Sequence, residues 1–246
     1  MSNPTRILYL IGSLDVGGTE RHLAMLVRSL NRARWQPAIY TLNRKGTLAP
    51  ELEAAGVAIH SPLQLSWFAR AGLLGRAARL VVVGVSLFAH LVRSRPPIVH
   101  CFLPASYLIG LPIALITRRP IRLMSRRSLN DYQRKGPLLA RFERMLHGSV
   151  AAVLGNSRAV IRELEEEGID KDRLRLIYNG IDVERTRPRI DRADTRARLG
   201  IALDVPVLIN VANLIPYKGH LDLLEALGRA RTKLPPPLAP NLRRPR

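Results

Sequence analysis

Two adjacent glycines mark the first stretch whose residue types could do chemistry. Gly17 and Gly18 follow an apolar run and directly precede a helical pattern. A helix that begins there directs unpaired backbone N–H groups and its positive dipole end toward an anion, and glycine lets that anion approach the backbone. The functional interpretation is a binding site for a phosphate or a sugar. The alternative is a tight turn between a strand and a helix.

Further polar residues follow other apolar runs. His100 lies at the expected end of a buried strand, where it serves either catalysis or a hydrogen-bonded core. Arg126 and Arg127 end another strand and have the guanidinium groups that suit phosphates, although a solvated basic loop is the plain alternative. Asn156 follows a third strand. Lys218 lies between a strand and a helix, where a cation would stabilise a departing phosphate.

Composition and missing motifs exclude several classes of protein. The net charge of +20 favours anionic partners, or reflects an arginine-rich proteome. No G-x-G-x-x-G and no P-loop motif is present, which disfavours dinucleotide and P-loop ATP binding. Aromatic residues are only 5% of the chain and do not interleave with basic loops, so nucleic acid is the least favoured partner. The single cysteine, Cys101, fits a reducing, cytoplasmic compartment.

The elements that must position these residues alternate between short apolar strands and helices. Strict alternation with nearly continuous apolar strands predicts an α/β fold: a Rossmann-like parallel sheet with helices on both faces. In such sheets ligands bind outside the carboxyl ends of the strands, which is where the polar residues fall. The expected strands are 6–14, 36–43, 57–63, 96–103, 121–128 and 150–157, and the expected helices are 20–31, 49–56, 67–93, 106–117, 138–149 and 158–168.

One long helical stretch, residues 67–93, contains an apolar run from Leu80 to Val92. Thirteen residues are too few to cross a bilayer, which needs about twenty. A buried helix is therefore the favoured interpretation. A helix that rests on a membrane is the alternative, because flanking arginines, among them Arg76 and Arg93, would suit lipid phosphates.

A change of pattern near residue 190 predicts a second domain. We expect a first domain at 1–188, a polar linker at 189–204, the start of an incomplete Rossmann-like domain at 205–231 and a disordered basic proline-rich tail at 232–246. Within 205–231 the order is strand, polar loop, helix. One strand and one helix cannot bury each other's apolar surfaces, so we expect residues 205–246 to be poorly ordered or collapsed.

Five stretches occur in an order and spacing that resemble the family-four (group 1) glycosyltransferases. They are GGTER, IVHCFLPASYLIG, VLGNSRAVIRELEEEGI, RLRLIYNGIDVERTRP and VANLIPYKGHLDLLEAL. The resemblance implies the GT-B architecture, with two Rossmann-like domains, the first for the acceptor and the second for most of the donor. It implies transfer of a sugar, with retention, from a nucleotide diphosphate to an acceptor hydroxyl, without a metal or another cofactor.

The resemblance also implies roles for individual residues. Gly17 and Gly18 would close over the donor phosphate or its sugar, His100 would line the acceptor side as the candidate catalytic residue, and Lys218 would hold the donor diphosphate. Asn156 and Asn213 join the candidate donor-binding set, Asn213 at a position where many relatives carry arginine. A lipid-linked or cell-envelope glycan at the inner face of a membrane is one candidate acceptor. The competing interpretation is a non-catalytic acceptor-binding remnant of such an enzyme.

Overall fold

A computed structural model describes residues 3–63, 72–129, 136–212 and 214–230 of the 246-residue chain. Asn213, most of the basic loop at 129–137 and the expected tail at 232–246 therefore lie outside the described residues. The chain divides into two compact units, Met1–Val183 (unit 1) and Glu184–Arg246 (unit 2).

Unit 1 is built on one seven-stranded sheet in which every neighbouring pair is parallel. The strand order is β3-β2-β1-β4-β5-β6-β7. The first six strands thus have the doubly wound Rossmann order, and the direction of winding reverses between β1 and β4. The strands are β1 (Thr5–Ile11), β2 (Trp35–Thr41), β3 (Ala58–His60), β4 (Ile98–Phe102), β5 (Ile121–Arg126), β6 (Ala152–Gly155) and β7 (Leu174–Leu176).

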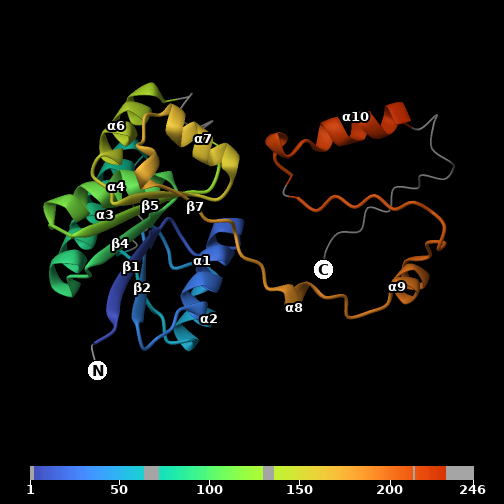
Figure 1. Ribbon diagram of the computed structural model, residues 1–246, viewed down its shortest axis with the longest axis horizontal. Coiled ribbons are helices and arrows are strands. Elements are labelled where there is room, and N and C mark those ends of the chain that lie inside the picture. The colour runs from blue at the N-terminus through green and yellow to red at the C-terminus, as the bar shows by residue number, and fades with distance from the viewer. Residues whose placement is uncertain (1–2, 64–71, 130–135, 213, 231–246) are drawn as a thin grey trace. The chain divides into compact units, whose positions relative to one another are not determined.

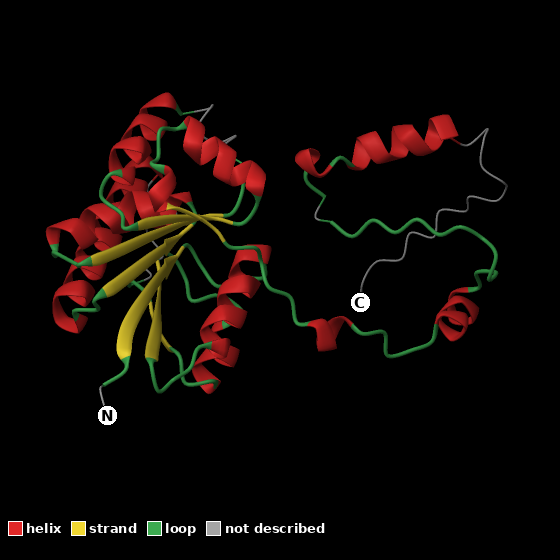
Figure 2. Cartoon of the chain, in the orientation of Figure 1, coloured by secondary structure: helices red, strands yellow, loops and turns green. Residues whose placement is uncertain are grey.

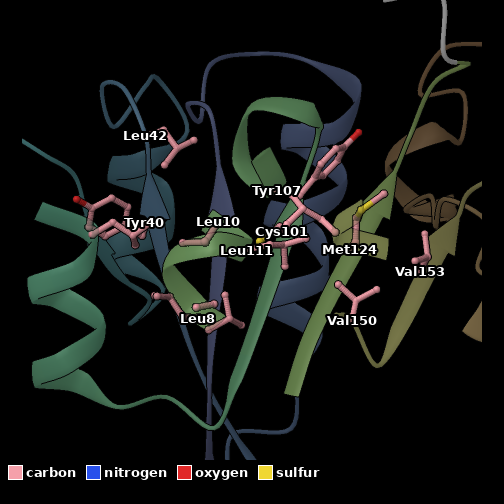
Figure 3. Packing of buried hydrophobic residues seen from close by; sticks show 14 of the residues in the cluster. Leu8, Leu10, Tyr40, Leu42, Cys101, Tyr107, Leu111, Met124, Val150 and Val153 are labelled. Carbon is pink, nitrogen blue, oxygen red and sulfur yellow. The ribbon is translucent and has the colours of Figure 1, made fainter. Parts of the chain in front are cut away.

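Helices cover both faces of this sheet (Figures 1 and 2). One buried cluster joins the sheet to α3, α4, α6 and α7, and a second joins it to α1 and α2. Figure 3 shows side chains of the first cluster, including Leu8, Cys101 and Met124. The helices of unit 1 are α1 (Gly18–Ser29), α2 (Ala49–Ala54), α3 (Gly72–Ser94), α4 (Pro104–Ile116), α6 (Pro137–His147), α7 (Arg158–Glu166) and the 3-10 helix η2 (Lys171–Arg173).

The sequence of β1 explains why both faces are covered. Leu8 and Leu10 belong to the first cluster, whereas Ile7, Tyr9 and Ile11 belong to the second. Successive side chains of a strand point to opposite faces, so a strand that is apolar at every position must be buried on both sides. The predicted parallel sheet with helices on both faces is confirmed.

The prediction that α3 is a buried helix is wrong for half of its surface. Val83, Leu87 and Leu91 pack in the core, but the opposite face is exposed. That face carries an apolar stripe at helical spacing: Leu74, Val81, Val85, Phe88 and Val92. By length and composition α3 is the one helix of the described chain that is long and apolar enough to cross a membrane, with a mean hydropathy of 1.6 and 17% of its most apolar window buried. Its core-packed face favours a helix of a folded unit.

Unit 2 contains short helices joined by extended chain. They are α8 (Val183–Thr186, across the unit boundary), α9 (Arg192–Leu199), the 3-10 helix η3 (Pro216–Lys218) and α10 (His220–Ala230). Asp191 caps α9 through a hydrogen bond from Ala193 N, and Gly200 ends it with a φ of 68°. Neither α9 nor α10 has a buried residue among those described. The strand expected from residue 205 is wrong, because residues 205–212 form no strand and Leu208 and Ile209 are exposed.

Candidate functional site

The reversal of strand order places the candidate site of unit 1 at the carboxyl ends of β1 and β4. Loops that leave two neighbouring strands in opposite directions separate at such a point, and open α/β sheets bind ligands there. The chain after β1 contains Gly17 and Gly18 and leads into α1, while the chain after β4 leads through Leu103 into α4. Two of the stretches singled out by sequence therefore meet at the same sheet edge.

The amino end of α1 is free of a side-chain cap. Gly17 is the N-cap residue, in an extended conformation, and as a glycine it makes no side-chain cap. A Cβ added to Gly18 would meet nothing within 4 Å, whereas one added to Gly17 would clash with the Glu20 carboxylate, which lies beside this helix end. Neither backbone conformation nor packing requires glycine at 18. The first-turn N–H groups have no partner within the helix, and with the open backbone of Gly18 they fit the approach of an anionic ligand.

His100 lies deeper than the sequence suggested. It is the middle residue of β4 rather than its last, and it is 6% exposed. Its Nε2 is 2.8 Å from Ser125 Oγ, and its ring packs against Tyr9 and Phe102. Burial, helped by the charge of nearby Arg127, lowers the pKa of His100 to about 3. His100 is therefore neutral at physiological pH and shares the features of a satisfied core histidine.

The neighbouring arginines point to opposite sides of the sheet, and only one of them remains a candidate for a phosphate. Arg126 is 1% exposed, and its guanidinium is paired with Glu143 of α6 and with Glu167, which follows α7. These contacts tie β5 to two helices. The expectation that both arginines face a ligand is thus corrected for Arg126, because its donors are directed into a buried ion-pair cluster.

Arg127 lies at the carboxyl edge and connects several segments. Its Nη1 donates to Asn179 Oδ1 at 2.7 Å, and its guanidinium carbon lies 5.1 Å from the centre of the Phe102 ring. Asn156 Nδ2 donates to the Arg127 carbonyl oxygen at 3.4 Å. Burial lowers the pKa of Arg127 to about 10, which leaves it charged at neutral pH. Arg127 and Asn156, both chosen from sequence, are therefore neighbours.

One residue near this group, His22 of α1, was missed by sequence reasoning. The pKa of His22 is lowered to about 4 by burial and by the charge of Arg127, and His22 in turn contributes to the lowered pKa of His100. No motif marks His22, because its neighbours come from distant parts of the chain. The one available signal was its position in the first turns of the helix after Gly18.

The remaining sequence candidates belong to unit 2. Lys218 is exposed at the end of η3, followed by Gly219 with a φ of 69° and by α10. The sequence order of polar loop and helix is thus present around Lys218. Asn213 lies outside the described residues.

Three potential metal ligands lie around the Arg126 guanidinium. Ligand atoms of Glu143, His147 and Glu167 lie within 4.8 Å of one another. The guanidinium of Arg126 is already paired with both carboxylates, so the positive charge that these groups require is supplied by a side chain. The residues fit a buried ion-pair cluster better than a metal centre.

Comparison with solved structures gives the same fold at low sequence identity. HepE of Anabaena, solved with UDP, matches with a TM-score of 0.71 at 20% identity, over 92% of this chain and 58% of that one. A glycosyltransferase of Rickettsia africae matches with a TM-score of 0.64 at 18% identity, over 94% of this chain and 59% of that one. Sucrose-phosphate synthase of Thermosynechococcus elongatus matches with a TM-score of 0.61 at 17% identity, over 92% of this chain and 60% of that one. The chain thus spans about three fifths of these GT-B proteins.

A comparison with curated proteins finds no match. The model of a protein family, described as Glycosyltransferase Family 4, matches residues 16–185. That range begins just before the two glycines, contains Arg127 and Asn156 and ends near the boundary of unit 1. The chain belongs to glycosyltransferase family 4.

Proposed function

We propose that the protein transfers a sugar from a nucleotide diphosphate donor to an acceptor hydroxyl. The observation that carries the proposal is the uncapped amino end of α1 beside the open backbone of Gly18, at the point where the strand order reverses. Family membership supports it, as do the UDP and UDP-glucose complexes of HepE. Since the chain spans 58% of HepE, the activity of a whole enzyme is part of the proposal.

The reaction that we propose proceeds with retention. The bond between the anomeric carbon and the diphosphate breaks, a bond to the acceptor oxygen forms on the same face, and the hydroxyl proton passes to the departing diphosphate. The proposal assigns the sugar or its adjoining phosphate to the Gly17–Gly18 turn of unit 1, and Lys218 remains a phosphate-binding candidate of unit 2. It needs no metal, because N–H groups, a helix dipole and a cation can offset the charge of the leaving group.

Calorimetry of the full chain with a panel of nucleotide sugars, UDP-glucose among them, tests the proposal. We expect micromolar binding of at least one member, weakened tenfold or more by Gly18→Val, because the added side chain occupies the approach to the helix end. Gly148→Val is the matched control, since Gly148 is equally open but lies after α6, on the chain entering β6. Equal effects of the two substitutions would contradict the assignment of Gly18.

A non-catalytic acceptor-binding module is the second candidate. One observation favours it: the described residues of unit 2 form no strand, and its α9 and α10 bury no side chain. A donor domain needs a sheet to position the nucleotide. Absence of binding across the whole nucleotide-sugar panel, with unit 1 folded, would support this candidate over the transferase.

The proposal extends to location and acceptor: a cytoplasmic protein that rests on the inner surface of a membrane and acts on a lipid-linked glycan. The exposed face of α3 supports it. Arg76, Arg79 and Arg93 of the same helix are exposed, although only Arg93 lies near the stripe and Arg79 donates to Asn43. Helices that combine an apolar stripe with basic residues lie in the interface instead of crossing it, and the basic residues suit anionic head groups. Contact with a membrane would cover apolar area that an isolated soluble unit seldom exposes.

Sedimentation with vesicles of phosphatidylglycerol or phosphatidylcholine tests the membrane contact. The double substitution Val81→Ser/Val85→Ser is expected to reduce binding to anionic vesicles at least fivefold. Its control is Leu221→Ser/Leu224→Ser in α10, where both side chains are also exposed. Equal binding to anionic and neutral vesicles would contradict an electrostatic attraction. Equal effects of the two double variants would contradict the assignment of the membrane contact to α3.

A further inference from the structure

Three buried polar atoms near the carboxyl edge of the sheet have no hydrogen-bond partner within the described part of the chain. They are His22 Nδ1 of α1, Arg127 Nε after β5 and Asn156 Oδ1 after β6. Buried polar atoms are nearly always paired, because an unmet one costs about 1–3 kcal/mol. Unpaired atoms on three separate elements near one arginine offer a ligand two kinds of hydrogen-bonding group that the chain itself leaves unmet.

Arg127 holds this group together. It accepts a hydrogen bond from Asn156 through its carbonyl, donates to Asn179 through Nη1 and is close enough to His22 to lower the pKa of that imidazole. The segment of Asn179 also contacts α1, since a Cβ added to Gly180 would lie 2.9 Å from Met25 Cε. The contacts place α1, the chain after β5 and the chain after β7 around one position.

Each of these three side chains is only half-buried. His22, Arg127 and Asn156 all retain exposed surface although the named atoms are covered. A ring flip of His22 exchanges the covered Nδ1 with the opposite side of the ring and leaves the backbone unchanged. Asn156 keeps its orientation, because an amide flip would break its hydrogen bond to the Arg127 carbonyl. A ligand at the edge can therefore reach His22 through side-chain rotation.

The three groups differ in hydrogen-bonding capacity, and the difference selects the ligand. Arg127 only donates, Asn156 Oδ1 only accepts, and a neutral imidazole donates at one nitrogen and accepts at the other. The ionised oxygens of a phosphate only accept, so Asn156 Oδ1 needs a hydroxyl donor, which a sugar supplies at several positions and inorganic phosphate only through its protonated oxygen. A hydroxyl both donates and accepts, and an anionic oxygen beside it satisfies the charge of Arg127.

We infer that His22, Arg127 and Asn156 form a subsite for a phosphate-bearing sugar, with His22 as a positioning residue for one of its hydroxyl groups. The inference rests on the proposed function, in which this sugar is the acceptor or its attachment point. The neutral state of His22 is essential, because a protonated imidazole has no acceptor nitrogen. The sugar phosphate is either free or part of a lipid-linked carrier, since both present the same groups.

Saturation-transfer NMR on the full chain tests the subsite, with glucose 6-phosphate, glucose 1-phosphate, glucose and inorganic phosphate as probes. We expect at least one sugar phosphate to bind ten times more tightly than glucose and inorganic phosphate. His22→Phe is expected to weaken that binding at least tenfold, whereas His22→Asn, which keeps a polar atom near the position of Nδ1, restores most of it. The matched control is His60→Phe, at another half-buried histidine whose pKa is lowered by burial.

Thermal unfolding of each variant separates loss of binding from loss of folding, and Asn156→Ala provides a second variant should His22→Phe unfold. Inorganic phosphate binding as tightly as the sugar phosphates would overturn the inference, as would equal binding by His22→Phe and the native protein. UDP-glucose is measured in parallel. If the protein binds sugar phosphate through His22 but binds no nucleotide sugar, the subsite is supported and the proposed transfer is contradicted. If it binds a nucleotide sugar but no sugar phosphate, the transfer is supported and the subsite is contradicted. Native membrane lipid extract competing against glucose 6-phosphate identifies the lipid-linked form.

Discussion

Two mainly apolar runs in this chain have opposite outcomes. Ile98–Phe102 of unit 1 forms β4, where Val99 is fully buried between two parallel neighbours. Residues 205–212 of unit 2 are as apolar but form no strand, and Ile209 and Val211 are 81% and 90% exposed. The difference shows that apolar content does not make a strand by itself. A strand forms where adjacent strands supply hydrogen bonds and helices cover its faces.

The largest effect that should separate the two units concerns ion pairs. Arg126→Met in unit 1 leaves Glu143 and Glu167 buried without their partner, and should reduce the free energy of unfolding by about 3–5 kcal/mol. Arg229→Met in unit 2 removes an ion pair with Glu225 whose side chains are 80% and 63% exposed, and should change it by less than about 0.5 kcal/mol. Urea unfolding followed by circular dichroism measures both, and comparable losses would contradict the contrast.

A matched pair of leucines tests the same contrast for apolar packing. Leu10→Ala removes a fully buried side chain from β1 and should cost about 3 kcal/mol of unfolding free energy. Leu208→Ala, at a residue that is 66% exposed, should change it by less than about 0.5 kcal/mol. A large effect at Leu208 would mean that residues 205–212 are packed in solution.

The smallest effect is a dependence of unit 1 stability on pH. Burial lowers the pKa of His100 to about 3 and of His90 to about 4, below the usual value of 6.5. The unfolded chain therefore binds more protons between pH 6.5 and pH 4, so stability is complete above pH 6.5 and falls as pH decreases through this window. The titration of these two histidines together should lower the free energy of unfolding by about 2 kcal/mol between pH 7 and pH 5.5.

Urea midpoints across this pH range measure the loss, and His90→Gln serves as the comparison. The variant lacks one titrating ring, whereas His22 and His60, whose pKa values burial also lowers, remain, so its stability should fall less steeply than that of the native protein. An unchanged slope would show that His90 titrates equally in the folded and unfolded chain.

The sheet and the position of the double glycine at a helix start could be predicted, because both depend on the pattern of neighbouring residues in the sequence. Strands such as β1 are apolar at consecutive positions, and Gly17 and Gly18 stand at a strand-to-helix junction whatever the rest of the chain does. The opposite directions of Arg126 and Arg127 also follow from the two-residue period of a strand.

Other features depend on contacts between distant segments, which no local pattern reveals. His22 gains its environment from Arg127, and the exposed side of α3 depends on which of its two apolar faces the sheet covers. The failure of residues 205–212 to form a strand has the same origin, since it reflects neighbours that the described chain does not supply.

The outermost strands of the sheet are also its shortest. β3 and β7 have three residues each, whereas β1 and β2 have seven. A rim this short offers few free N–H and C=O groups, so an incoming chain gains little by pairing with it. Unit 1 should thus resist edge-to-edge polymerisation despite its continuous hydrophobic strands. Any tendency of the protein to aggregate should originate from the bare aliphatic residues near Ile209, which makes that segment the first place to add solubilising charges.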